Sequence, residues 1–157
     1  MKQDKFLTGI LIGIGALVVI ALALFFTRQD KHDYLPEDTP GGVAHNYVLA
    51  VLNKDYEKAY GYLADLKNKP TYEDFRQSFL NNMVNPDGTG ADIGDATING
   101  DEAVVDVILY YSYSDPFSSR TGSPDRALLV KQDGEWKLSS MPYTFWDWNW
   151  YQEPYNP

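Results

Sequence analysis

Few of the residue types that do enzyme chemistry occur in this chain of 157 residues, which has two histidines and no cysteine. A catalytic histidine needs a nucleophile or a carboxylate as its partner. His45 lies at the margin of an apolar helical stripe, which favours a surface or half-buried polar role, and His32 lies in a polar stretch. Two isolated histidines do not make a zinc site. The sequence therefore predicts no catalytic residue, no metal and no cofactor.

Asp106 is the most interesting carboxylate, because it interrupts an apolar strand. It shares a face with Val104, Ile108 and Tyr110. If that face lined a cavity, Asp106 would be a desolvated base with a raised pKa. The opposite face is more uniformly apolar and is the better candidate for the core. We therefore expect Asp106 to point outward, to solvent or to a partner.

Two further groups of oxygen-bearing side chains could bind a ligand. Four of them faintly resemble a calcium loop around Gly90, but the twelfth position is Ala96, so the bidentate acid is missing and an ordinary polar loop is expected. The calcium candidates are Asn85, Asp87, Thr89 and Asp92. Several tyrosines could furnish a cavity with hydroxyl donors, although core residues with a hydrated tip show the same pattern. These tyrosines are Tyr47, Tyr60, Tyr62, Tyr110, Tyr111 and Tyr113.

The aromatic tail, residues 142–157, is rich in indoles. Trp146, Trp148 and Trp150 alternate with polar residues, so an extended chain would place all three on one side. The tail could fold back on the domain, dock on a partner protein, insert among lipid headgroups or stack on sugars. We predict a partner-binding site made by these tryptophans and Tyr151.

Residues 6–26, from Phe6 to Phe26, carry no charge, and fourteen of the twenty-one are Leu, Ile, Val or Phe. A helix of this length spans roughly 30 Å, the thickness of a bilayer core. The pattern predicts a retained transmembrane helix in contact with membrane lipid; a cleaved signal ending near Ala23 is the alternative. Gly9 and Gly13 form a GxxxG pair that would let another helix approach closely.

The charge divides unevenly along the chain. Residues 1–32 hold four basic and two acidic residues, a net of +2, whereas residues 33–157 hold nine basic and twenty acidic residues, a net of −11. An acidic domain repels phosphate backbones, which argues against nucleic-acid binding. Basic residues before and after the apolar segment are nearly balanced, and the free N-terminal amine slightly favours a cytoplasmic N-terminus in the plasma membrane and an extracytoplasmic domain.

Three helices are predicted after a polar linker. The first has an apolar stripe from Ala44 to Leu52, the second is capped by Asp55, and the third begins at Thr71 with Asp74 three residues later. The apolar side of the third helix extends to Met83.

Strands follow these helices, because the apolar period then changes to two. Asn99-Gly100 predicts a hairpin turn before a long strand, Ala103–Tyr113. A polar connection, Ser114–Asp125, leads to another hairpin around Asp133-Gly134.

The stretch Thr39–Leu66 (TPGGVAHNYVLAVLNKDYEKAYGYLADL) resembles the opening of nuclear transport factor 2-like domains, especially uncharacterised bacterial ones carried on a membrane anchor. Tyr72–Phe75 resembles the third helix of that family, and Asn99–Ala103 and Asp133–Leu138 resemble its two hairpins. The resemblance implies a cystatin-like α+β cone. The family includes ketosteroid isomerases, dehydratases and many non-catalytic binding or assembly modules. Its enzymes need an acid or base inside the cone, and no residue here matches one.

The predicted fold class is α+β, with an N-terminal single transmembrane helix and then three helices packed on a curved antiparallel sheet of about four strands. The predicted parts are a cytoplasmic stub (1–5), the span (6–26), a linker (27–42), the nuclear transport factor 2-like domain (43–141) and the aromatic tail (142–157).

The leading functional hypothesis is a non-enzymatic, membrane-anchored accessory or assembly subunit that contacts other subunits of a membrane complex. The alternatives are an envelope module that binds a ligand or glycan in the cone pocket and, third, a cone-pocket isomerase or dehydratase.

Overall fold

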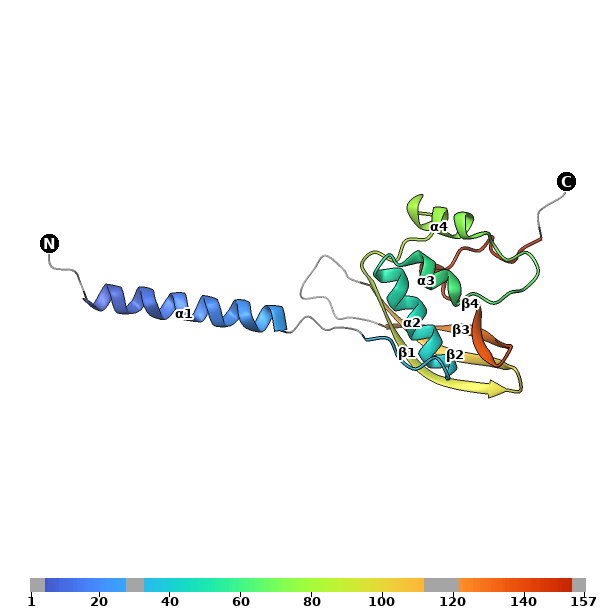
Figure 1. Ribbon diagram of the computed structural model, residues 1–157, viewed down its shortest axis with the longest axis horizontal. Coiled ribbons are helices and arrows are strands. Elements are labelled where there is room, and N and C mark those ends of the chain that lie inside the picture. The colour runs from blue at the N-terminus through green and yellow to red at the C-terminus, as the bar shows by residue number, and fades with distance from the viewer. Residues whose placement is uncertain (1–4, 28–32, 112–121, 154–157) are drawn as a thin grey trace. The chain divides into compact units, whose positions relative to one another are not determined.

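A computed structural model describes residues 5–27, 33–111 and 122–153 of the chain. The chain forms two compact units, Met1–Asp33 and Tyr34–Pro157. The first unit contains one helix, α1 (Lys5–Thr27), and the second contains the remaining helices and a sheet (Figure 1).

The predicted transmembrane helix is overturned. Within the part of the chain that the structure describes, no helix is long and apolar enough to cross a membrane. The span over residues 6–26 and the single-pass plasma-membrane location are corrected accordingly. A Cβ on Gly9 or Gly13 would meet no described atom within 4 Å, and their helix-packing role stays a prediction.

The second unit is α+β, as the sequence predicts, with three helices followed by a four-stranded antiparallel sheet. Each strand pairs with the next in the chain, in the order β1-β2-β3-β4. The elements are α2 (Pro40–Leu52), α3 (Tyr56–Gly61), α4 (Tyr72–Leu80), β1 (Thr89–Asn99), β2 (Glu102–Tyr111), β3 (Gly122–Gln132), β4 (Glu135–Ser140) and the 3-10 turn η1 (Tyr143–Phe145).

Side-chain caps fix where the helices begin. The backbone N–H of Lys58 donates to Asp55, and that of Asp74 donates to Thr71 (3.2 Å each), so both predicted caps are confirmed. Helix α2 begins before its apolar stripe, because the Thr39 side chain accepts a hydrogen bond from the Gly42 N–H and Pro40 occupies the first helical position. Helix α4, the third of the predicted helices, ends at Leu80, so Met83 lies beyond it and is exposed.

Two tight turns set the sheet register. Asp133 and Gly134 both have positive φ (52° and 87°), and they form the predicted hairpin turn. In the earlier hairpin Asn99 pairs with Glu102, so the loop residues are Gly100 and Asp101, one position later than predicted. The polar connection predicted to end at Asp125 ends earlier, since β3 begins at Gly122.

The core lies between α2 and one face of the sheet, which we call the inner face (Figure 1). The alternation along β2 buries Ala103, Val105, Val107 and Leu109, the face that the sequence assigns to the core. Register shifts between Ile93 and Ala96 and between Leu128 and Leu129 interrupt the ladders. Such irregularities bend strands, which agrees with the predicted curvature.

The segment Tyr34–Thr39, which we call the strap, is fastened to the second unit. Asn46, fully buried on α2, accepts from the Leu35 N–H (2.7 Å) and donates to the Leu35 carbonyl oxygen (2.8 Å). The Tyr62 hydroxyl donates to a Glu37 carboxylate oxygen at 2.7 Å. Part of the stretch predicted as linker is thus bonded to the helices.

Candidate docking site

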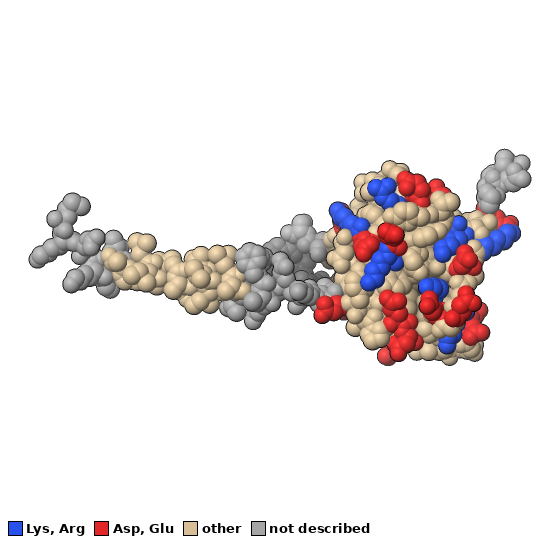
Figure 2. Space-filling view, viewed as in Figure 1, with Lys and Arg blue, Asp and Glu red and all other residues tan. Residues whose placement is uncertain are grey.

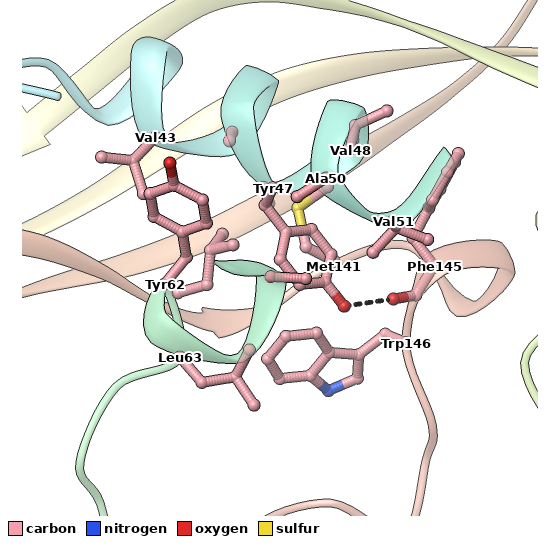
Figure 3. Close-up of a cluster of buried hydrophobic side chains, with 14 of the residues drawn as sticks. Val43, Tyr47, Val48, Ala50, Val51, Tyr62, Leu63, Met141, Phe145 and Trp146 are labelled. Atoms are coloured by element: carbon pink, nitrogen blue, oxygen red, sulfur yellow. Dashed lines mark hydrogen bonds between the residues drawn. The ribbon is translucent and has the colours of Figure 1, made fainter. Parts of the chain in front are cut away.

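The aromatic tail is built into the core at its start. Phe145 is fully buried, and the Tyr47 hydroxyl on α2 donates to its carbonyl oxygen at 2.7 Å (Figure 3). The Tyr47 ring also packs on Trp146, with centroids 6.0 Å apart. Burial raises the pKa of Tyr47 well above its ordinary value, so the phenol stays protonated and keeps donating.

Trp146 and Trp150 are buried structural residues, 7% and 5% exposed. Their rings meet edge to face at 4.9 Å, and Trp150 packs on Phe75 of α4 at 4.8 Å. Tyr151 stacks on the other indole, Trp146, at 5.9 Å. Contacts of this kind contribute about 0.5–1.5 kcal/mol each beyond the burial of apolar surface. The indoles therefore fasten the tail to α4.

Asp147, between these indoles, is a buried acid whose two carboxylate oxygens are both used. One oxygen accepts from the Ser78 hydroxyl on α4 at 2.9 Å. The other accepts from the backbone N–H and the side-chain amide of Asn149, each at 2.9 Å. A carboxylate that caps the backbone two residues later forms an Asx turn. The turn fixes the backbone around Trp148.

Tyr151 closes this turn on its far side. Its hydroxyl donates to the Ala64 carbonyl oxygen at 2.6 Å, and its backbone N–H donates to the Asn68 carbonyl oxygen at 3.2 Å. Burial raises the pKa of Tyr151 above its ordinary value, since desolvation disfavours the phenolate. Tyr151 is half-buried and serves as a fastening residue.

Trp148 alone among the three alternating tryptophans points to solvent, with 77% of its surface exposed. An extended tail would have placed all three indoles together. The turn at Asp147 instead buries the first and third indoles and displays the second. The sequence contains the signal for this turn, Asp147 two residues before Asn149, but a reading based on alternation alone misses it.

The other predicted candidates are dispersed. Asp106 is exposed on the face of β2 opposite the inner face, as predicted, and its Oδ1 atom lies 3.7 Å from the Nε atom of Arg126. His45 is half-buried, and its Nε2 atom has no hydrogen-bond partner among the described residues. In the calcium-like loop, Asn85 accepts from the Asp87 N–H, while Thr89 and Asp92 lie in β1. Among the described residues no three acids or histidines are grouped to hold a metal.

The candidate tyrosines do not converge on one cavity. Tyr47 lies in the core, the Tyr60 hydroxyl donates to the Pro70 carbonyl oxygen, and Tyr62 is bonded to Glu37. Tyr110 and Tyr111 alternate on opposite faces of β2. Tyr113 lies outside the described residues. The phenols that are bonded thus have separate partners.

The surface of the second unit has hollows that could hold a small ligand. One, of about 260 Å³, is lined by Val51 and Phe79 together with polar residues such as Asn82. Another, of about 270 Å³, is lined by Tyr62, Trp136 and the charged residues Glu37 and Lys137 among others. Both are slightly smaller than the roughly 300–1,000 Å³ of usual small-molecule sites.

No family model and no curated protein matches the chain. Among solved structures, a SEC-C motif protein from Rhodopseudomonas palustris is 12% identical with a TM-score of 0.49, covering 68% of this chain and 79% of that one. A candidate ketosteroid isomerase from Shewanella frigidimarina is 21% identical (TM-score 0.47; 68% and 96% covered). A cystatin-like protein of unknown function from Nostoc punctiforme is 18% identical (TM-score 0.45; 61% and 80%).

With TM-scores below 0.5 these neighbours carry no argument about the family of this chain, and the resemblance to nuclear transport factor 2-like domains stays a prediction. They have no bearing on the membrane-anchored type. At these identities and scores, the likeness says nothing about activity.

Proposed function

We propose that the second unit is a non-enzymatic contact module, an accessory or assembly subunit that docks on a protein partner through Trp148. The observation that carries this proposal is the display of Trp148, 77% exposed between two buried indoles. Tryptophan is enriched among the residues that dominate binding energy at protein interfaces.

The rigidity of the turn supports this role. Association costs less when the contacting group is already held in its bound geometry. Asp147 caps the backbone on one side of Trp148, and the Trp150 N–H donates to the Asp147 carbonyl oxygen at 3.1 Å on the other. The indole is thus presented on a fixed backbone, so binding a partner loses little backbone entropy at this turn.

The hydrogen bonds that the buried acid Asp147 already makes argue against an enzyme with its catalytic acid inside the cone. Asp147 is the carboxylic acid among the buried polar side chains of the described residues. Its two oxygens already accept hydrogen bonds from Ser78 and Asn149. A general acid or base must instead be free to meet a substrate proton. Asp106, the other acid weighed for this role, is exposed beside Arg126.

The alternative of a ligand- or glycan-binding module has one observation in its favour, the hollow beside Tyr62 and Trp136. Its volume of about 270 Å³ suits a fragment better than a whole small molecule. The tyrosines that would have lined a larger cone are used elsewhere. Docking through Trp148 is therefore the better supported function.

The test compares Trp148→Ala with Tyr143→Ala in the source cells. Tyr143 is a matched control, because it is also an exposed aromatic of the same tail, at 58%. We expect wild type and Tyr143→Ala to migrate in native gels as a complex larger than two copies of the chain, and Trp148→Ala to lose it. Unchanged stability of Trp148→Ala shows that the loss is one of docking.

A photo-crosslinking amino acid at position 148 gives a second readout. We expect an adduct with one discrete partner, which the same group at position 143 does not form. A wild-type protein that never exceeds the mass of two copies, or a Trp148→Ala variant that keeps the larger complex, overturns the proposal.

A further inference from the structure

The side of the sheet turned away from the helices, which we call the outer face, carries large apolar side chains in water. Ile108 on β2 is 39% exposed and Leu128 on β3 is 44% exposed, and Val104 lies half-buried beside them. The residues that alternate with these are buried in the core, so the outer face is a separate surface. Exposed apolar side chains that gather on one face and are bordered by polar residues mark interaction sites.

The register of β2 and β3 arranges this face in matched rungs. Val104 lies opposite Leu128, Asp106 opposite Arg126, and Ile108 opposite Pro124. The next rung sets Tyr110 opposite Gly122. The Ile108 side chain of β2 occupies the space beside Gly122, where a Cβ atom would lie 2.5 Å from the Ile108 Cγ2 atom. The central charged rung is thus flanked by apolar rungs on both sides.

This arrangement is complementary to itself. A two-fold axis that runs parallel to the strands, midway between β2 and β3, exchanges the two members of every rung. In a second copy placed by that axis, Arg126 faces Asp106 and Leu128 faces Val104. Apolar groups then meet apolar groups, and each charge meets its opposite. Aligned sheets pack in this manner about 10 Å apart.

We propose that the outer face of the sheet binds a second copy of this chain, with the Asp106–Arg126 rung at the centre of the interface. The charges favour a second copy over other occupants. Within the central rung the acid and the base cancel, and the further acids of this face, Glu102 and Asp92, lie on rungs away from that centre. The unit as a whole is acidic, and Figure 2 shows acidic side chains among the basic ones on its visible surface. A self-complementary pair overcomes this general repulsion locally.

Asp106 and Arg126 can be replaced with little effect on the folding stability of one copy. Asp106 and Arg126 lie 3.7 Å apart with 66% and 73% of their side chains exposed. Exposed pairs contribute little to folding, so charge reversal leaves the monomer folded. The same reversal across an interface places like charges together, which weakens association strongly.

The experiment measures self-association of the full chain by sedimentation equilibrium. We expect wild type to form dimers, and Asp106→Arg or Arg126→Asp alone to raise the dissociation constant about tenfold or more. The double variant restores the dimer, and an equimolar mixture of the two single variants forms a heterodimer. Leu128→Glu disrupts association, whereas Leu52→Glu, equally exposed at 44% on α2, does not.

The absence of cysteine allows a test of the register itself. In the proposed dimer Val104 of one copy faces Leu128 of the other across the gap between the sheets, so a short bis-maleimide crosslinks a mixture of Val104→Cys and Leu128→Cys chains faster than either chain alone. A monomeric wild type, single charge variants that associate as wild type does, or crosslinking without this preference overturns the proposal.

Discussion

The hydroxyl of Tyr47 donates to the carbonyl oxygen of Phe145, and this buried hydrogen bond joins α2 to the start of the aromatic tail across 98 residues of sequence. The bond lies beside the Trp146 ring (Figure 3). A buried carbonyl that loses its donor keeps the full cost of its desolvation. The relationship between the two residues therefore links the stability of the core to the position of the tail.

Tyr47→Phe tests this link, because it removes the donor and keeps the ring. We expect the free energy of unfolding to fall by about 1–3 kcal/mol, measured by urea titration of tryptophan fluorescence. Tyr143→Phe is the matched control, since Tyr143 is exposed and its hydroxyl lies 3.4 Å from that of Tyr111. Equal losses for both variants would contradict the buried bond.

Asp147→Ala tests the Asx turn that displays Trp148. The change removes the acceptors of Ser78 and Asn149, and we expect a loss of about 2–3 kcal/mol of stability. Ser78→Ala removes one of these bonds, and a double-mutant cycle should give a coupling of about 1 kcal/mol. Additive losses in thermal or urea unfolding would show that the 2.9 Å contact between the two side chains contributes nothing.

Asn46→Ala tests the strap. The change removes both bonds to the Leu35 backbone, so we expect a loss of about 1–2 kcal/mol and faster hydrogen exchange at the Leu35 amide. Asn53→Ala, at the exposed C-terminal cap of α2, is the control and should change stability by less than about 0.5 kcal/mol. Unchanged exchange at Leu35 in Asn46→Ala would mean that other contacts hold the strap.

Alkaline pH should destabilise the second unit through Tyr47 and Tyr151. Burial raises the pKa of both phenols in the folded state above the ordinary value of 10.0. Above pH 10 the unfolded chain therefore binds fewer protons than the folded one, and stability falls as pH rises. Their contribution is fully present below pH 10. Urea midpoints between pH 8 and pH 12 measure the fall, and Tyr151→Phe should make it shallower.

Local signals in the sequence were sufficient for most of the second unit. Asp55 and Thr71 cap helices where their spacing predicts, and the alternation along β2 identifies its buried face. These features depend on neighbours within a few residues. The earlier start of α2 was also readable, because Thr39-Pro40 is a cap followed by a first-turn proline. The apolar stripe alone gave a later start.

The candidate site depended on contacts that are distant in sequence. Alternation places Trp146, Trp148 and Trp150 on one side only if the chain is extended, and the hydrogen bond from Ser78 to Asp147 favours a turn instead. No local sequence pattern indicates that Ser78, 69 residues away, bonds to Asp147. The same holds for Asn46, whose bonds to Leu35 turn a polar segment into the strap. The predicted span is contradicted separately, since no helix in the described part of the chain is long and apolar enough to cross a membrane.

The long sequence separation between Tyr47 and Phe145 also has a consequence for biosynthesis. Helix α2 is among the earliest segments of the second unit to be made, yet Phe145, Trp146 and Trp150 cover it and its neighbours only about a hundred residues later. Until the ribosome has delivered those aromatic residues, the nascent unit exposes apolar surface that a chaperone would recognise. Acquisition of the native state is thus delayed until elongation has passed the tryptophan turn.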